Sequence, residues 1–319
     1  MPFDFIQSKR PTGPLIMFGM VLLTVIVATA ITKGLYITPG NLTDILRMIA
    51  PEAIMAMGMT FVILTAGIDL SVGSILALAS VACAAVLTSS ILPGSLLIAI
   101  PLAILVALIV GGLCGALQGV LIAWLDIQAF VVTLAGLIGF RGVAKLYTDN
   151  QKIQLGSEHA VANLLSTKPV MIGTLMAVTL FSMVLLRSTV FGRSVRAVGD
   201  NERAAHYAGL PVPWLKLAVY TYSGMLAGIA GLLLCARNTV GDANFGVMDE
   251  LEAIAMVVIG GTSLMGGKGT VIGTVFGVFI MGTVINVLGL KNVDSNVQQV
   301  LLPVIILLAV GLQLNRKRV

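Results

Sequence analysis

Apolar stretches about as long as a bilayer is thick follow one another along almost the whole chain. A helix needs about 20 mostly apolar residues to cross the hydrocarbon core. Segments of this kind lie at residues 15–31, 51–66, 75–87, 95–125, 129–146, 170–186, 217–235, 254–264, 271–288 and 300–314. Only 10% of the residues are charged, against about 25% in soluble proteins. We therefore predict an all-α fold, a polytopic membrane helix bundle of about ten transmembrane helices that forms one domain over residues 1–319.

The orientation of this bundle follows from its one long polar interruption, Arg187 to Lys216. This segment carries five basic residues and two acidic ones: Arg187, Arg193, Arg196, Arg203 and Lys216 against Asp200 and Glu202. Basic loops stay on the cytoplasmic side of a membrane. Ten spans put this segment on the same side as the basic residues 9–10 and 316–318, so both termini are expected in the cytoplasm. The net charge of +5 then reflects topology rather than binding of nucleic acid.

A helix over residues 201–208 is predicted inside the basic segment. Asp200 suits the N-cap, Glu202 stands in the first turn, and Gly209 suits the left-handed position after the last turn. Small side chains form one face of this helix: Ala204, Ala205 and Ala208. Such a face fits a groove on a partner protein, but an ordinary solvated helix would have the same sequence. On these residues alone both interpretations stay open.

Glycine spacing predicts one close helix contact and one internal repetition. Gly111, Gly115 and Gly119 follow one another at intervals of four, which places them on one helix face that can approach a neighbour closely. A weaker pattern recurs at an offset of 200 residues: Glu52-Ala53-Ile54 with Glu252-Ala253-Ile254, Gly67 with Gly267, and Gly73 with Gly273. Chance produces such matches in apolar sequences, but a true pair of glycine-interrupted helices indicates a substrate path in a transporter.

Asp69 is the most conspicuous polar residue of the apolar regions. A carboxylate at the bilayer centre costs roughly 2.5–3.5 kcal/mol on insertion scales, so one retained there is usually functional. Asp69 either caps the helix that follows, with Ser71 in its first turn, or contacts a substrate or gate. Gln118, Arg141 and Asn286 also fall inside predicted spans. They line a polar pathway or hydrogen-bond neighbouring helices, and we keep all five as candidate pathway residues.

The sequence predicts no catalytic, metal or cofactor site. Residues 260–270 resemble a phosphate-binding loop, but Lys268 is followed by Gly269 instead of Ser or Thr, so a turn is expected there. Cys83, Cys114 and Cys235 each stand alone in apolar segments, where a cysteine acts as a small buried hydrophobe.

Three motifs together resemble the permease subunit of bacterial ABC importers of the ribose type, a family that also serves galactose, xylose, arabinose and autoinducer uptake. The matching residues are Ala53-Ile54-Met55-Ala56-Met57-Gly58-Met59-Thr60 with Gly67-Ile68-Asp69-Leu70-Ser71-Val72-Gly73-Ser74, then Gly192-Arg193 with Ala197, Gly199, Asn201, Ala204, Ala205 and Gly209, then Gly260-Gly261-Thr262-Ser263-Leu264 with Gly266-Gly267-Lys268-Gly269. The likeness covers nearly the whole chain.

This resemblance implies a multi-pass inner-membrane permease for a monosaccharide or related solute. It implies three partners in the bilayer or beside it: a cytoplasmic ATP-binding subunit, an extracytoplasmic sugar-binding protein and a second permease copy. The helix at residues 201–208 would be the coupling helix that fits the ATPase cleft. The residues expected to couple are Gly199, Asn201, Glu202, Ala204, Ala205 and Gly209. The permease itself would carry no catalytic site.

Three alternatives belong to other transport classes. An ion-coupled secondary transporter usually needs several intramembrane acids or histidines, and only Asp69 approaches that description. A branched-chain amino acid permease shares the general plan, and Arg141 would be the cationic partner of a substrate carboxylate. A passive channel would work without any partner.

Overall fold

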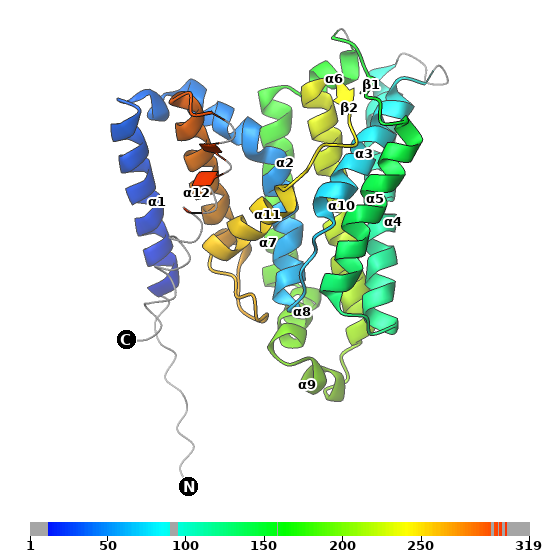
Figure 1. Ribbon diagram of the computed structural model, residues 1–319. Coiled ribbons are helices and arrows are strands. Elements are labelled where there is room, and N and C mark those ends of the chain that lie inside the picture. The colour runs from blue at the N-terminus through cyan, green and yellow to red at the C-terminus, as the bar shows by residue number, and fades with distance from the viewer. Residues whose placement is uncertain are drawn as a thin grey trace.

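The computed structural model describes residues 12–89, 95–157, 159–294, 297–298, 300–301 and 304, with side chains from residue 17 onward. Most of these residues are helical (Figure 1). The helices are α1 (Thr12–Ile31), η1 (Leu35–Ile37), α2 (Pro39–Leu64), α3 (Val72–Leu87), α4 (Leu96–Trp124), α5 (Ala129–Thr148), α6 (Ala160–Leu165), α7 (Lys168–Ser188), α8 (Val190–Asp200), α9 (Glu202–Tyr207), α10 (Val212–Asn238), α11 (Asp249–Ile259) and α12 (Val271–Leu290). Two short strands, β1 (Ile153–Gln154) and β2 (Val240–Gly241), pair antiparallel, with Ile153 opposite Gly241.

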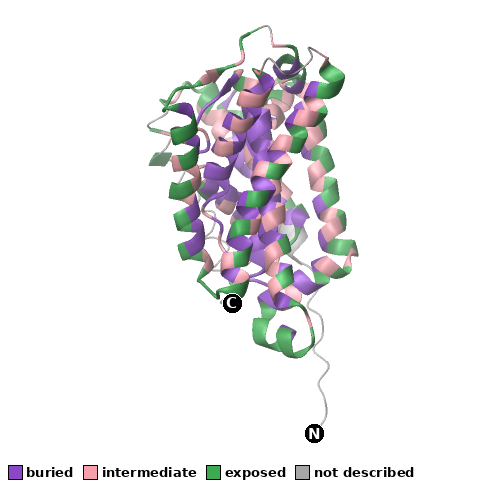
Figure 2. Ribbon diagram, turned by 90° about the vertical axis from the view of Figure 1, so that its right-hand side faces the viewer, coloured by how far each residue is buried: buried purple, intermediate pink, exposed green. Residues whose placement is uncertain are grey.

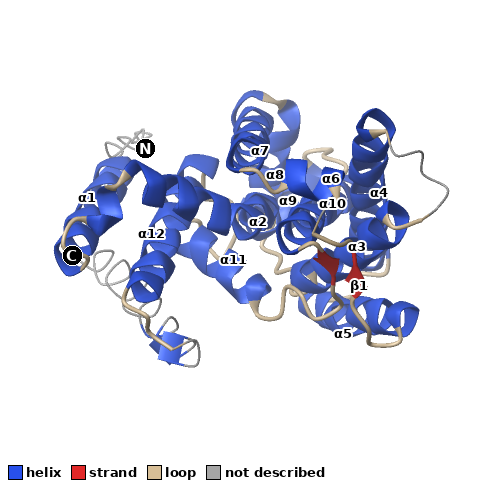
Figure 3. Cartoon of the chain, turned by 90° about the horizontal axis from the view of Figure 1, so that it is seen from above, coloured by secondary structure: helices blue, strands red, loops and turns tan. Residues whose placement is uncertain are grey.

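The bundle is built around α2 and α10, which lie in its middle when it is seen from above (Figure 3). The helix α10 packs against α2, α3 and α4, while α2 also contacts α7, α11 and α12. Almost every residue of α2 from Ile49 to Leu64 is buried. Buried residues gather in the interior of the bundle, and the outer helices expose apolar side chains (Figure 2). That distribution suits a protein whose outer surface faces lipid.

The predicted glycine face of residues 111–119 is confirmed in the contact between α4 and α10. A Cβ atom at Gly111 would collide with the carbonyl oxygen of Gly224, and one at Gly115 would collide with that of Tyr220. A Cβ atom at Gly119 would come within 2.9 Å of the Cα of Leu217. The two backbones therefore touch along three turns, which no larger residue would permit.

Six described helices are long and apolar enough to cross a membrane: α2, α4, α5, α7, α10 and α12. The apolar residues 17–31 of α1 and the helix α3 are shorter, and α11 has 11 residues. These helices correspond to the predicted spans from 15–31 to 271–288. The tenth predicted span, residues 300–314, lies outside the described residues apart from positions 300, 301 and 304.

The residues before position 51 carry an apolar face of Leu42, Ile45, Leu46 and Ile49, which by itself is compatible with a short helix on the membrane surface. In the structure they belong to α2, which starts at Pro39, has Thr38 as its N-cap, and continues through Pro51 to Leu64. The reason is packing against α12. Ile45 and Ile49 lie against the backbone of Gly282, within 3.3 and 3.7 Å of an ideal Cβ at that glycine. The apolar face therefore covers a protein helix instead of the membrane surface.

The basic segment forms two helices, α8 and α9, at one end of the bundle, and the first turn of α1 lies at this same end (Figure 1). Asp200 is the last residue of α8 and does not cap α9, as the sequence had suggested. Asn201 is the N-cap, because its side chain accepts the backbone N–H of Ala204 at 2.9 Å. Gly209 has φ +84°, which confirms the predicted left-handed position after the helix.

Candidate functional site

Two non-helical segments meet inside the bundle. Residues 65–71 separate α2 from α3, and residues 242–248 connect β2 to α11. The second segment packs against the start of α3, just beyond the first segment, because a Cβ atom at Gly73 in the first turn of α3 would collide with the carbonyl oxygen of Gly246. Irregular backbone at membrane depth is tolerated where protein surrounds it or where it lines a water-filled cavity. The interruptions therefore mark the interior region where a polar path is possible.

Three of the five expected pathway residues come together in this region. The Asp69 carboxylate accepts the backbone N–H of Ser71 at 2.9 Å and the Ser71 hydroxyl at 2.6 Å. Ser223 on α10 donates to its other oxygen at 3.4 Å. Gln118 on α4 donates to the Ser71 hydroxyl at 2.6 Å. This buried polar cluster joins α4 and α10 to the break before α3.

The exposure of the buried polar cluster bears on whether Asp69 supports the start of α3 or contacts a substrate or gate. Asp69 and Ser71 are 0% exposed and Gln118 is 1% exposed. Ser71 is the N-cap of α3, and the Asp69 carboxylate accepts both its N–H and its hydroxyl, so Asp69 holds the residue at the helix start without being the cap itself. Two polar atoms beside it have no partner among the described residues, Gln118 Oε1 and the Tyr220 hydroxyl.

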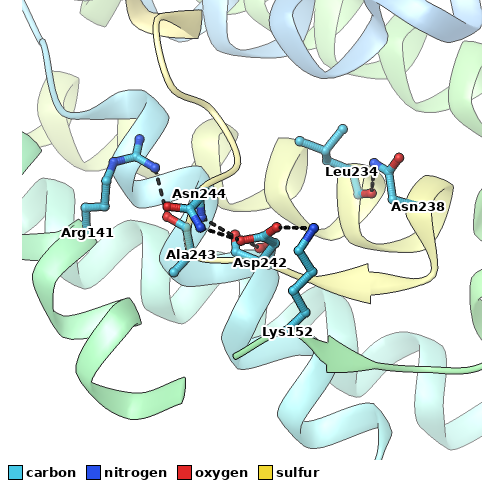
Figure 4. Close-up of polar contacts among 8 residues, drawn as sticks. Arg141, Lys152, Leu234, Asn238, Asp242, Ala243 and Asn244 are labelled. Atoms are coloured by element: carbon cyan, nitrogen blue, oxygen red, sulfur yellow. Dashed lines mark hydrogen bonds and ion pairs between the residues drawn. The ribbon is translucent and has the colours of Figure 1, made fainter. Parts of the chain in front are cut away.

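Arg141 on α5 fastens the segment 242–248 to the bundle (Figure 4). Its guanidinium donates to the carbonyl oxygens of Ala243 and Phe245, both at 2.8 Å, and to that of Gly246 at 3.3 Å. Arg141 is half-buried. It therefore binds backbone next to the buried polar cluster without forming part of it.

The fifth expected residue, Asn286, lies elsewhere. Its side chain on α12 exchanges two hydrogen bonds with the side chain of Asn41 on α2, at 3.0 and 2.9 Å. Such an amide pair joins two helices, which agrees with the packing interpretation of this residue.

Sequence reasoning missed an acidic face next to the interruption. The acidic residues between Arg237 and Glu252 are by themselves typical of a loop outside the membrane, but Asp249, Glu250 and Glu252 form the first turn of α11 inside the bundle. Glu52 on α2 lies within electrostatic range of Glu252 and Asp249. The one signal that could have found this pairing is the repetition at an offset of 200, which aligns Glu52 with Glu252.

Asp242 lies beside the paired strands β1 and β2 (Figure 4), at the end of the bundle opposite α8 and α9 (Figure 1). Lys152 forms an ion pair with it at 3.0 Å, and the backbone N–H of Asn244 donates to it at 2.8 Å. Burial raises the pKa of this carboxyl, but the hydrogen bonds from Asn244 and Lys152 and the Lys152 charge outweigh it, so the pKa lies below its usual value.

The short helix α9 presents most of its surface to solvent at the end of the bundle. Asn201, Glu202, Ala204 and Gly209 are exposed. Ala205 is 5% exposed and packs with three apolar residues of α8 and α10: Val198, Val212 and Leu215. Ala205 thus lies behind the helix and holds it to the bundle.

A cavity of about 490 Å³, lined by both charged and apolar side chains, opens beside α9. The residues around it are Ala123, Asp126, Glu202, Arg203, His206, Tyr207, Val212, Pro213 and Lys216. Lys216 and Glu202, both in its lining, form an ion pair at 2.6 Å, which ties α9 to α10. Tyr207 is 88% exposed. An aromatic side chain so exposed beside a cavity is typical of a surface that a protein partner covers.

Comparison with known proteins gives a consistent result. The family model described as branched-chain amino acid transport system / permease component matches residues 41–310. The ribose import permease of Bacillus subtilis is 39% identical, over 99% of this chain and 95% of that protein. The ribose import permease of Haemophilus influenzae is also 39% identical, over 91% of this chain and 90% of that one. The xylose transport system permease of Escherichia coli is 31% identical, over 95% and 92%.

No solved structure matches the chain significantly. The family model covers more than half of the residues, and the similar proteins align over nearly their whole length. The chain belongs to the family of ABC-importer permeases that includes the ribose and xylose permeases.

Proposed function

We propose that this chain is the membrane permease subunit of an ATP-driven importer for a monosaccharide or a closely related solute. The observation that carries the proposal is the similarity to ribose import permeases over 99% of the chain. The polar interruptions inside an apolar bundle agree with it, because an importer needs a path for a hydrated solute through the bilayer. The energy source is a separate ATP-binding subunit.

The ATP-binding subunit docks on α8 and α9. Exposed coupling residues on this surface are Asn201, Glu202, Ala204 and Gly209. Two of the expected coupling residues are buried beneath this surface. Ala205 packs α9 against the bundle, and Gly199 lies at the end of α8. This end of the molecule faces the cytoplasm of a multi-pass inner-membrane protein of about ten spans, with both termini on that side.

The solute passes along the face bordered by α5 and α11, which lie on one side of the bundle (Figure 3). Asn244 is exposed on this face, and Arg141, Asp249 and Glu252 are half-buried. Lipid cannot solvate these groups, since each charged side chain at the bilayer centre costs roughly 2.5–3.5 kcal/mol on insertion scales. A second permease copy closes this face, so that the groups line a wet path between the two copies.

Carboxylates and a guanidinium on such a path suit the hydroxyl groups of a sugar, because they accept and donate the hydrogen bonds that water would otherwise make. The cluster of Asp69, Ser71 and Gln118 is buried behind the face bordered by α5 and α11. These residues position the side chains that line the path, and they contact the solute only if the packing around residues 65–71 opens. The sugar-binding protein binds at the end of the bundle opposite α8 and α9, where β1, β2 and α6 lie (Figure 1).

Solute class is tested in proteoliposomes that contain the permease, its ATP-binding subunit and its binding protein. Uptake of labelled pentoses and hexoses is measured in competition with unlabelled sugars and with leucine. We expect competition by at least one sugar and none by leucine. Uptake of leucine with no sugar uptake would instead establish a branched-chain amino acid permease.

The proposed path is tested by Glu252→Gln and Asp249→Asn. Both are expected to lower sugar uptake while the ATP-binding subunit stays attached. Asp44→Asn is the matched control, since Asp44 is an exposed carboxylate that pairs with Lys168 away from this face. Full uptake by both path variants would exclude these carboxylates from the path.

A further inference from the structure

Three segments that lie far apart in the sequence meet at the end of α8. They are the last turn of α2 with Leu64, the end of α8 with Gly199, and the turn between α11 and α12 with Gly266 and Gly267. Gly199 belongs to the second motif noted in the sequence and Gly266-Gly267 to the third, while Leu64 lies between the two halves of the first. We call this meeting point the α8 joint.

Backbone atoms alone make the central contact of the α8 joint. A Cβ atom at Gly199 would collide with the carbonyl oxygen of Leu64 and would lie 2.6 Å from the backbone nitrogen of Gly267. The same Leu64 carbonyl accepts the N–H of Gly267 at 3.0 Å. One peptide group at the end of α2 therefore contacts both other segments, with no side chain between them.

The turn between α11 and α12 is shaped for this contact. Gly266 has φ +84° and Gly267 has φ +70°, conformations that cost other residues about 1–2 kcal/mol each. A Cβ atom at Gly266 would lie 2.7 Å from the carbonyl oxygen of Gly199, and one at Gly267 would collide with the Asp200 side chain. Ala66, two residues after the end of α2, also has φ +59°.

The position of the α8 joint connects the docking surface to both interrupted regions. Asp200 directly precedes Asn201, the N-cap of α9. Leu64 leads into residues 65–71 with Asp69, and Gly267 lies between α11, which carries the acidic face, and α12. Closely packed backbones move as a unit or exchange between discrete arrangements. A displacement of α8 and α9 therefore reaches both interruptions through the same few atoms.

We infer that Gly199, Gly267 and the Leu64 carbonyl are positioning residues for the coupling of ATP hydrolysis to transport. They fix the docking surface to the end of α2 and to the turn between α11 and α12, so that one movement of α8 opens or closes both sides of the path. This inference rests on the proposed function. It adds the turn at residues 266–267, which lies outside the docking surface, to the parts that couple the two subunits.

The test uses Gly267→Ala and Gly199→Ala in the reconstituted complex and measures the ATP hydrolysed per sugar taken up. A Cβ at either position forces the segments apart. We expect the ATP-binding subunit to remain bound and to hydrolyse ATP, while the ATP used per sugar rises about tenfold, a size typical of coupling between sites. An unchanged ratio in both variants would overturn the inference.

Gly228→Ala and Gly173→Ala are the controls. A Cβ at Gly228 would collide with the carbonyl oxygen of Ala107, so this site between α10 and α4 is packed as closely as the α8 joint. Gly173 has no atom within 4 Å of an added Cβ. We expect Gly228→Ala to lower stability and neither control to change the ATP used per sugar. An equal rise in Gly228→Ala would show general loosening and would also overturn the inference.

A second measurement needs no variant. Hydrogen exchange of peptides covering residues 264–269 is followed in the wild-type complex with and without ATP. We expect the Gly267 amide to stay protected in both states, because the α8 joint moves as one body, while exchange at residues 65–71 changes. Loss of protection in one state would contradict the inference. Wild-type complexes without ATP-driven sugar uptake would refute the proposed function itself, whatever the variants show.

Discussion

Replacement of Asp69 separates a structural role from a role in solute recognition. Asp69→Ala removes the acceptor of two short hydrogen bonds, from the N–H and the hydroxyl of Ser71. Asp69→Asn keeps an oxygen in the same place and changes only the atom that faces Ser223 at 3.4 Å. The two variants therefore differ mainly in the two bonds that hold the start of α3.

The magnitude follows from burial. Asp69 and Ser71 are fully buried, and each buried donor left without a partner costs about 1–3 kcal/mol. Asp69→Ala should therefore lower the free energy of unfolding by about 2–6 kcal/mol, and Asp69→Asn by about 1 kcal/mol. Because 1 kcal/mol shifts the unfolding midpoint by roughly 2–4 °C in large domains, thermal unfolding in detergent resolves the two variants.

Transport is measured on the same preparations as uptake of one labelled sugar in competition with a panel of others. A structural Asp69 predicts an unchanged order of preference in Asp69→Asn and an unfolding midpoint only slightly lower than that of the wild type. A variant that keeps the wild-type midpoint but changes its order of preference would refute the structural role. The carboxylate would then have to contact the solute.

Three further outcomes are expected. Asn201→Ala removes the cap of α9 and should cost about 1 kcal/mol, seen as weaker binding of the ATP-binding subunit; unaltered binding would exclude a role for the cap in docking. The pKa of Asp242 is lowered in the folded state, so the stabilisation that this carboxylate gives is present above its unfolded pKa of about 3.9 and is lost as pH falls through the folded value. Thermal midpoints should therefore fall at acidic pH more steeply in the wild type than in Asp242→Asn. Parallel curves for the two proteins would contradict this. Arg141→Lys keeps the charge but loses the fork that reaches three carbonyl oxygens, so both stability and uptake should fall, and wild-type values for both would show that the charge alone suffices.

Features that follow from local periodicity were predicted well from the sequence. Long apolar segments define helices because the bilayer sets their length, and the spans at 95–125 and 129–146 agree with α4 and α5. The glycine face at residues 111–119 was equally clear, because spacing by four residues fixes a helix face. The left-handed Gly209 followed from turn chemistry.

Features that depend on long-range contacts were not predictable in the same way. Residues 242–248 look like an outer loop in sequence, since nothing local shows that Arg141 holds their carbonyl oxygens inside the bundle. The acidic residues 249–252 are likewise typical of a loop, and only the packing of α11 shows that they begin a helix. Asp200 and Asn201 are both good caps, and only the length of α8, which ends at Asp200, decides between them.

The candidate site residues show the same difference between local sequence patterns and long-range contacts. Asp69, Ser71 and Gln118 were chosen because polar groups are rare in apolar spans, and the fold places them together. Asn286 was chosen on the same ground but pairs with Asn41. Rarity thus identifies a buried polar residue, while the identity of its partner depends on how the helices pack.

The energy source of uptake is the most direct test of the proposed function. Sugar uptake is measured in proteoliposomes with the binding protein outside and ATP inside, with and without the ATP-binding subunit, and in the presence of a protonophore. ATP-driven import predicts uptake that requires the ATP-binding subunit and survives the protonophore. Uptake that continues without that subunit and stops with the protonophore would contradict it and would establish an ion-coupled transporter.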